Sequence, residues 1–111
     1  MWQTPFRQMK VFEDYAGRAV RLTPEREMHI LDHPEMLDLL DQVREAISAP
    51  EKVVRSASDS TVELYYRFER ETKVGDKWLC VVVKYSIDDA FVVTAYLTDK
   101  VKKGEHLWPK K

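Results

Sequence analysis

The sequence is poor in cysteine and glycine and has no long apolar run, and these shortages exclude several classes of protein. Its one cysteine, Cys80, can form neither an internal disulfide nor a zinc site built on several thiolates, so a disulfide scaffold is excluded and a cytoplasmic setting is expected. The longest apolar run, residues 78–83, is far shorter than the roughly 20 residues of a bilayer-spanning helix. The first residues show no signal-peptide pattern, and we therefore expect no membrane partner.

Charge is balanced overall but divided along the chain. The net charge of the 111 residues is -1, but residues 25–45 hold seven acids and two bases, and residues 99–111 hold five lysines and two acids. The overall balance argues against a protein that coats nucleic acid without specificity. The length predicts a single domain over residues 1–111, with an ordered core over about 8–98 and a basic tail over 99–111. Such a chain is too short for the large folds that hold dinucleotides, and no cofactor is expected.

The first third of the chain predicts a small hairpin followed by a helix. Residues 8–14 and 18–22 are short segments rich in valine, phenylalanine and arginine, and Gly17 between them supplies a turn conformation that other residues adopt poorly. Thr23 and the proline after it have the pattern of a helix N-cap and a first helical residue, with acids in the first turn. A helix is therefore expected over residues 24–33.

The apolar period changes from 3.6 to 2 near residue 50. A repeat of apolar residues at helical spacing predicts a second helix over residues 35–48. The runs that follow are rich in β-branched and aromatic residues and predict an antiparallel meander with strands over 51–55, 62–70, 78–86 and 90–98. The predicted fold is therefore α+β, with an N-terminal β-hairpin and two helices packed on one face of an antiparallel sheet of at least four strands.

Alternation along the strands divides this sheet into a core face and an open face. The core face is expected to carry mainly apolar side chains: Val62, Leu64, Tyr66, Phe68, Leu79, Val81, Val83, Tyr85, Phe91, Val93, Ala95 and Leu97. The open face is then expected to carry Tyr65, Arg67, Lys84, Thr94 and Tyr96. Two tyrosines, a hydroxyl and two cations on one sheet face suit a phosphate and a stacked base, which predicts an RNA-binding surface.

Several segments together resemble a known superfamily. They are His29 and His33-Pro34-Glu35, Leu64-Tyr65-Tyr66-Arg67, Val81-Val82-Val83-Lys84, Phe91-Val92-Val93-Thr94-Ala95-Tyr96 and Lys102-Lys103-Gly104-Glu105-His106-Leu107-Trp108. Over residues 24–108 the chain resembles small bacterial and phage domains of the barnase/EndoU/colicin/RelE-like (BECR) nuclease superfamily. The resemblance implies a metal-independent ribonuclease, with RNA as substrate and a protein inhibitor or antitoxin as a further partner. It maps the helical histidine to His29, the sheet cations to Arg67 and Lys84, and a late-strand hydroxyl to Thr94.

His29 and His33 lie four residues apart and share one face of the expected helix. An imidazole that titrates near neutrality can take a proton from a ribose 2'-hydroxyl or donate one to the leaving oxygen, while Arg67 and Lys84 stabilise the growing phosphate charge. The alternative is a pair of ordinary surface histidines. A zinc pair lacks a third ligand at helical spacing, so no metal site is expected. His106 in the tail is expected to be solvated.

The other candidate residues also have plain structural interpretations. Arg67 and Lys84 can form cross-strand ion pairs, and Tyr65 and Tyr96 are common strand residues. The tail lysines can be simply solvated. The leading hypothesis is nevertheless a metal-independent ribonuclease with catalytic residues His29, Arg67, Lys84 and Thr94 and substrate contacts at Tyr65, Tyr96, His33, Lys102 and Lys103. The alternative is a non-catalytic interaction module of the same fold.

Overall fold

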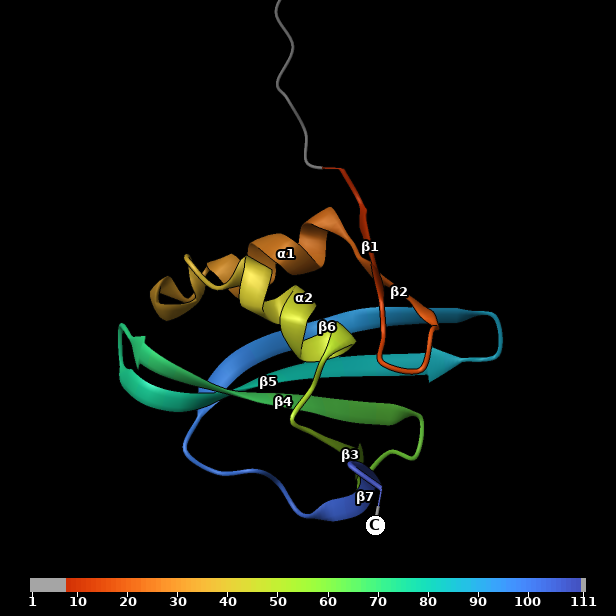
Figure 1. Cartoon of the computed structure of the whole chain (residues 1–111). Coiled ribbons are helices and arrows are strands. Elements are labelled where there is room, and N and C mark those ends of the chain that lie inside the picture. The colour runs from red at the N-terminus through yellow and green to blue at the C-terminus, as the bar shows by residue number, and fades with distance from the viewer. Residues whose placement is uncertain (1–7, 111) are drawn as a thin grey trace, which may run out of the picture.

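The computed structural model describes residues 8–110, in which a layer of helices covers one face of a curved sheet (Figure 1). The elements in chain order are β1 (Lys10–Glu13), β2 (Ala19–Leu22), α1 (Pro24–Leu31), the 3-10 turn η1 (Pro34–Met36), α2 (Leu40–Ser48), β3 (Lys52–Ser56), β4 (Val62–Thr72), β5 (Gly75–Ser86), β6 (Asp89–Thr98) and β7 (Gly104–Trp108). The predicted α+β class, with helices packed on a sheet, is confirmed.

The sheet has seven strands in the order β1-β2-β6-β5-β4-β3-β7. Neighbouring strands are antiparallel except β2 and β6, which pair in parallel through Arg21 and Phe91. The predicted antiparallel sheet of at least four strands is present as β3 to β6, and the parallel pairing of β2 with β6 makes the whole sheet mixed. A parallel pair requires a long connection, and here the connection contains both helices and three strands. Because β2 lies beside β6, the N-terminal hairpin is part of the same sheet.

Two local signals in the first third of the chain are confirmed. Gly17, in the turn between β1 and β2, has a φ of 88°, a conformation that glycine adopts at little cost. Thr23 caps α1, since its Oγ1 accepts a hydrogen bond from the backbone amide of Arg26 at 3.3 Å. The helix ends at Leu31 because the residue before Pro34 is extended, as proline requires of its predecessor.

The predicted second helix over residues 35–48 is divided in two. A single 3-10 turn covers Pro34–Met36, and α2 begins only at Leu40. Between them, the amide of Leu39 donates to the carbonyl oxygen of Met36 at 3.0 Å. This three-residue spacing places both side chains on one side of the chain, and both are buried. The apolar repeat is therefore satisfied by tighter turns instead of a continuous α-helix.

The predicted face assignment is confirmed for β5 and wrong for β4. Tyr65 lies opposite Val81 and faces the helices, so Leu64 and Tyr66 face away from them. The alternation in β4 is uninformative because three consecutive residues, Leu64 to Tyr66, are buried. A strand that is covered on both faces has no polar side to mark its orientation.

A bulge in β6 causes the second error of face assignment. Consecutive residues of β5 pair with Val92 and Thr94, so Val93 is an extra residue in β6. Before the bulge the alternation is shifted by one position, which turns Val92 toward the helices and Phe91 away from them. Phe91 and Val93, both predicted core residues, are only half-buried, whereas Ala95 lies on the predicted side.

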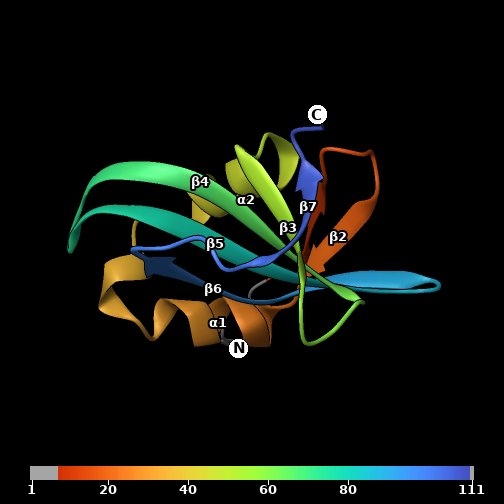
Figure 2. The same ribbon diagram turned by 90° about the horizontal axis from the view of Figure 1, so that it is seen from below.

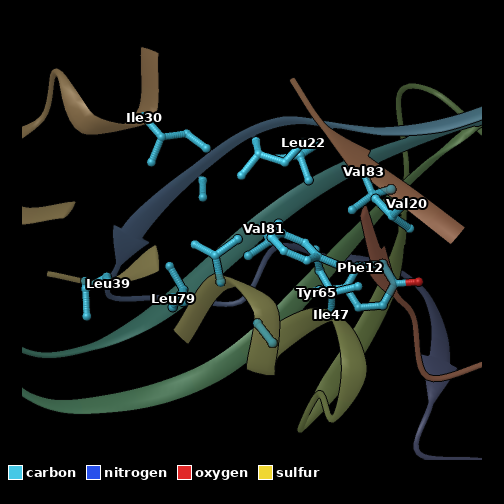
Figure 3. Packing of buried hydrophobic residues seen from close by; sticks show 14 of the residues in the cluster. Phe12, Val20, Leu22, Ile30, Leu39, Ile47, Tyr65, Leu79, Val81 and Val83 are labelled. Atoms are coloured by element: carbon cyan, nitrogen blue, oxygen red, sulfur yellow. The ribbon is translucent and has the colours of Figure 1, made fainter. Parts of the chain in front are cut away.

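The main core lies between the helices and the sheet (Figure 3). Fully buried side chains come from α1 (Ile30), α2 (Ile47), the hairpin (Leu22) and the sheet (Tyr65 and Val81). Burial of one large aliphatic side chain contributes roughly 1.5–3 kcal/mol. Because one cluster contains residues from all of these elements, it fixes the helices and the hairpin against the same sheet face.

After β6 the chain crosses the sheet face that carries no helix, which we call the open face (Figures 1 and 2). This crossover, residues 99–103, leads to β7, which pairs with β3 at the edge of the sheet. Val101 of the crossover packs on a second cluster whose buried members are Val54, Leu64, Tyr66 and Cys80. The segment predicted to be a basic tail therefore covers part of the open face and adds an edge strand.

Replacement of Gly104 by alanine is expected to lower the free energy of unfolding by about 1–3 kcal/mol, the usual cost of forcing extra atoms into packed structure. Gly104 begins β7 so close to β3 that a Cβ would clash with the carbonyl oxygen of Arg55 and the side chain of Val54. Urea denaturation measures the loss, and hydrogen exchange of the β7 amides locates it. The matched control is Glu105→Ala, at the exposed next residue. Equal stability of the two variants would contradict this account of Gly104.

Candidate nucleic-acid interface

The open face is hollowed into a groove of about 420 Å³. Its lining residues come from the end of β3, the β3–β4 loop, the strands β4 to β6 and the crossover: Ser56, Ala57, Ser58, Asp59, Val62, Leu64, Val82, Thr94, Tyr96, Lys102 and Lys103. The sheet contributes a mostly apolar surface, the loop contributes hydroxyls, and the crossover contributes two cations. This volume lies within the usual range of small-molecule sites, about 300–1,000 Å³.

Strand register places the groove side chains in ordered rows. Leu64, Val82 and Thr94 are directly paired across β4, β5 and β6, and in the next row Cys80 is paired with Tyr96. Strands lie about 4.8 Å apart, so the row from Leu64 to Thr94 spans about 10 Å.

The crossover is fixed to the sheet through a tyrosine. The backbone amide of Lys102 donates a hydrogen bond to the Tyr66 hydroxyl at 3.1 Å. Burial raises the pKa of the Tyr66 phenol and of the Cys80 thiol, so both groups remain neutral near pH 7. This contact leaves the side chains of Lys102 and Lys103 exposed beside the groove. Cys80 is a buried packing residue and not a nucleophile.

The groove has an excess of positive charge. Within the part of the chain that the structure describes, neither Lys102 nor Lys103 forms an ion pair with a carboxylate. Asp59 is the one acid among the lining residues, and its Oδ2 lies 3.4 Å from Nζ of Lys84. Hydrogen bonds from the hydroxyl and amide of Thr61 lower the pKa of the Asp59 carboxyl, which is therefore ionised and offsets Lys84. The two crossover lysines remain available to an anion.

Five of the nine predicted site residues lie together on or beside the open face. Thr94, Tyr96, Lys102 and Lys103 line the groove, and Lys84 is adjacent through its contact with Asp59. The phenol of Tyr96 has a raised pKa because it is partly buried, so it acts as a neutral donor or acceptor and an aromatic surface. The structure thus places the two predicted tail lysines beside the predicted strand residues in one groove.

The other four predicted residues lie on the helix side of the sheet. Tyr65 is fully buried in the main core, and Arg67 donates from Nη1 to the carbonyl oxygen of Ala49, after α2, at 2.8 Å. His29 and His33 are exposed in the helical layer, with their rings 6.3 Å apart. The sheet therefore separates both histidines from Thr94, and His29 does not meet the geometric requirement for proton transfer in the groove.

His106, which was expected to be solvated in a tail, lies on the open-face side of β7. It pairs with Val54, whose side chain belongs to the open-face cluster, and paired residues of antiparallel strands point to the same side. His106 therefore extends the row that contains Leu64, Val82 and Thr94. The β-forming residue Trp108, with the apolar Leu107 before it, was the available signal that this segment is a strand.

A second polar cluster lies under the β1–β2 turn, on the helix side of the sheet. Oδ2 of Asp14 accepts from Nε of Arg18 and from the hydroxyl of Tyr85, both at 2.7 Å. Oε1 of Glu63 accepts from Nη2 of Arg18 and the hydroxyl of Tyr65, both at 3.1 Å. Burial raises the pKa of both tyrosines, which therefore stay neutral donors. The cluster anchors the hairpin to the sheet.

Among residues 8–110, no three His, Cys, Asp or Glu side chains are placed to hold a metal ion. No helix in this range is long and apolar enough to cross a bilayer. Comparisons of the chain with protein-family models, curated proteins and solved structures find no match.

Proposed function

We propose that this chain binds single-stranded RNA on its open face, with a phosphate of the RNA held at Lys102 and Lys103. The observation that carries the proposal is the groove itself, which joins these two unpaired lysines to the hydroxyls of Thr94, Ser56 and Ser58. A groove with cations along one side and a partly apolar surface can hold a phosphate and the base beside it.

A single strand fits this groove better than a duplex. The groove contains an aromatic ring, Tyr96, and an aliphatic surface formed by Val62, Leu64 and Val82. These groups favour contact with the flat face of a base, which is available only when the base is unpaired. Duplex recognition instead depends on backbone contacts over a long basic surface, whereas the charged residues that line this groove are two lysines, Lys102 and Lys103, and one acid, Asp59.

The proposal is tested by fluorescence anisotropy with a labelled, unstructured RNA oligonucleotide. Two phosphate contacts predict that the logarithm of the association constant falls with the logarithm of salt concentration with a slope of about -1.4, because each neutralised phosphate of a single strand contributes about -0.7. A duplex of the same length is the control and is expected to bind more weakly. No binding at low salt, or preferential binding of the duplex, would contradict the proposal.

Metal-independent cleavage of the bound RNA is a second candidate function, and the location of His106 favours it. His106 is exposed on the open-face side of β7, where its Nε2 lies 2.8 Å from the carbonyl oxygen of Pro109, and it is a candidate for the proton transfer because the sheet separates His29 and His33 from the groove. In this version His106 takes or donates the proton, while Lys102 and Lys103 stabilise the phosphate charge. A protein inhibitor would then be an expected partner.

Cleavage is tested with single-stranded RNA and EDTA-treated protein. If His106 transfers a proton in the rate-limiting step, His106→Ala lowers the rate by about 100-fold or more. The matched controls are His29→Ala and His33→Ala, which are expected to retain the wild-type rate because both residues lie in the helical layer. If the RNA stays intact after incubation with wild-type protein, the cleavage function is excluded and only the binding function remains.

A further inference from the structure

Two aromatic residues lie on the open face, beyond the row that contains Tyr96. Phe68 of β4 and Trp78 of β5 are directly paired, and Trp78 is paired with Thr98 of β6. The rings of Phe68 and Trp78 are 5.3 Å apart at an interplanar angle of 76°, and both are half-buried. Trp78 also packs against the open-face cluster of Val54, Leu64, Tyr66 and Cys80. This aromatic pair is not among the lining residues of the groove.

A cationic side chain lies near each ring of the aromatic pair. Nζ of Lys52 lies 5.6 Å from the centre of the Trp78 ring, and the guanidinium carbon of Arg70 lies 5.3 Å from the centre of the Phe68 ring. Both cationic side chains are exposed. Arg70 is only loosely associated with Asp76, at 3.9 Å, and within residues 8–110 Lys52 forms no ion pair. Aromatic rings beside available cations are the combination that binds an unpaired base together with its phosphate.

The aromatic pair and the groove are separated by a distance that a short RNA strand can span. From Val82 in the groove to Trp78 there are four residues along β5, which corresponds to about 13 Å at the rise of an antiparallel strand. The crossover, with Lys102 and Lys103 exposed, lies on this face between the two ends of the sheet (Figure 2). A strand that lies over the crossover therefore meets cations along its path.

We propose that Phe68 and Trp78 form a second subsite, which stacks an unpaired base of the same RNA strand that occupies the groove. This inference rests on the proposed function and adds a length requirement to it. A dinucleotide can occupy the groove alone, whereas a longer strand also reaches the aromatic pair. Base stacking on a protein aromatic residue contributes enough that its loss weakens binding by about 10-fold or more.

The test uses the full chain in which Trp2 and Trp108 are replaced by phenylalanine, so that Trp78 is the one fluorescent tryptophan. An octauridylate is expected to quench Trp78 and to bind about 10-fold more tightly than a diuridylate. Phe68→Leu, which keeps an apolar side chain on the sheet, is expected to weaken octauridylate binding and leave diuridylate binding unchanged. Val74→Ala, at an exposed position in the β4–β5 turn, is the matched control and is expected to alter neither affinity.

The outcomes separate this inference from the function on which it rests. If the octauridylate binds with the salt dependence given above but neither quenches Trp78 nor loses affinity in Phe68→Leu, the second subsite is wrong and groove binding stands. Equal affinity of the octauridylate and the diuridylate also overturns the subsite. If neither oligonucleotide binds, the proposed function fails and the subsite fails with it.

Discussion

Replacement of Arg18 by methionine is expected to lower the free energy of unfolding by about 3 kcal/mol, the largest stability effect that we predict for one side chain. Removal of one partner from a buried ion pair costs roughly 3–5 kcal/mol, because the remaining charge stays buried without compensation. Arg18 is the cation that contacts both Asp14 and Glu63, whose side chains are 0% and 10% exposed. Because the Arg18 side chain itself is 42% exposed, we expect the low end of this range.

Further contacts of Arg18 support the same expectation. Its guanidinium carbon lies 4.0 Å from the centre of the Tyr85 ring, and its Nη2 donates to the Tyr65 hydroxyl at 3.3 Å. The neighbouring acids raise the pKa of Arg18 despite the opposing effect of burial, so it remains fully charged. Methionine keeps much of the apolar contact with Tyr85 but leaves both carboxylates without a cation.

The matched control for this variant is Arg21→Met in the same hairpin. Arg21 forms an ion pair with Asp89 at 2.5 Å, but both partners are open to solvent, and such surface pairs contribute little to stability. Urea denaturation followed by circular dichroism measures both variants. A loss for Arg18→Met no greater than that for Arg21→Met would contradict the view that this cluster anchors the hairpin.

Reversal of charge at both crossover lysines, Lys102→Glu with Lys103→Glu, is expected to weaken RNA binding by about 1,000-fold at low salt. An ion pair at contact in water contributes about 1 kcal/mol, and each substitution converts an attraction into a repulsion. Both side chains are exposed, so salt reduces the effect. The stability of the chain should change little, because the crossover is held through the backbone amide of Lys102 and the side chain of Val101.

The matched control reverses the same number of charges on the opposite side of the molecule. Arg26 and Arg44 are the two bases within residues 25–45, and both are exposed in the helical layer. Arg26→Glu with Arg44→Glu gives the same net charge as the crossover variant. Affinity from fluorescence anisotropy should fall much further for the crossover variant. An equal fall in both variants would indicate that only overall charge governs binding.

Local signals in the sequence were sufficient to predict most elements of the fold. Thr23 with the following proline marked the start of α1, Gly17 marked a turn with positive φ, and β-forming runs marked β3 to β6. These features depend on neighbouring residues alone. The division of the second helix was not predictable in this way, because helical and 3-10 turns satisfy the same apolar repeat around Met36 and Leu39.

Which side chains of β4 and β6 face the helices depends on contacts between distant segments and on a bulge, and could not be predicted from local patterns. In β4, the hairpin network covers Tyr65 on one face and the crossover covers Tyr66 on the other, which removes the polar positions that reveal orientation. In β6, the bulge at Val93 reverses the alternation within one strand. Neither effect leaves a clear local signal in the sequence.

The candidate site was predicted only in part, because contacts between distant segments also bring its residues together. Thr94, Tyr96 and Lys84 were expected on the open face, and the structure places them on or beside the groove of that face. Lys102 and Lys103 lie beside these residues because of the path of the crossover and the pairing of β7 with β3. That pairing joins segments about 50 residues apart, and local patterns carry no information about it.

The most direct test of RNA binding on the open face is an NMR titration of the isotopically labelled chain with an unstructured RNA oligonucleotide. The account predicts the largest amide shift changes at Thr94, Tyr96, Lys102 and Lys103, which line one groove. It predicts little change at His29, because the sheet lies between α1 and that groove. Shift changes concentrated in α1 and α2, or none at saturating RNA, would contradict it.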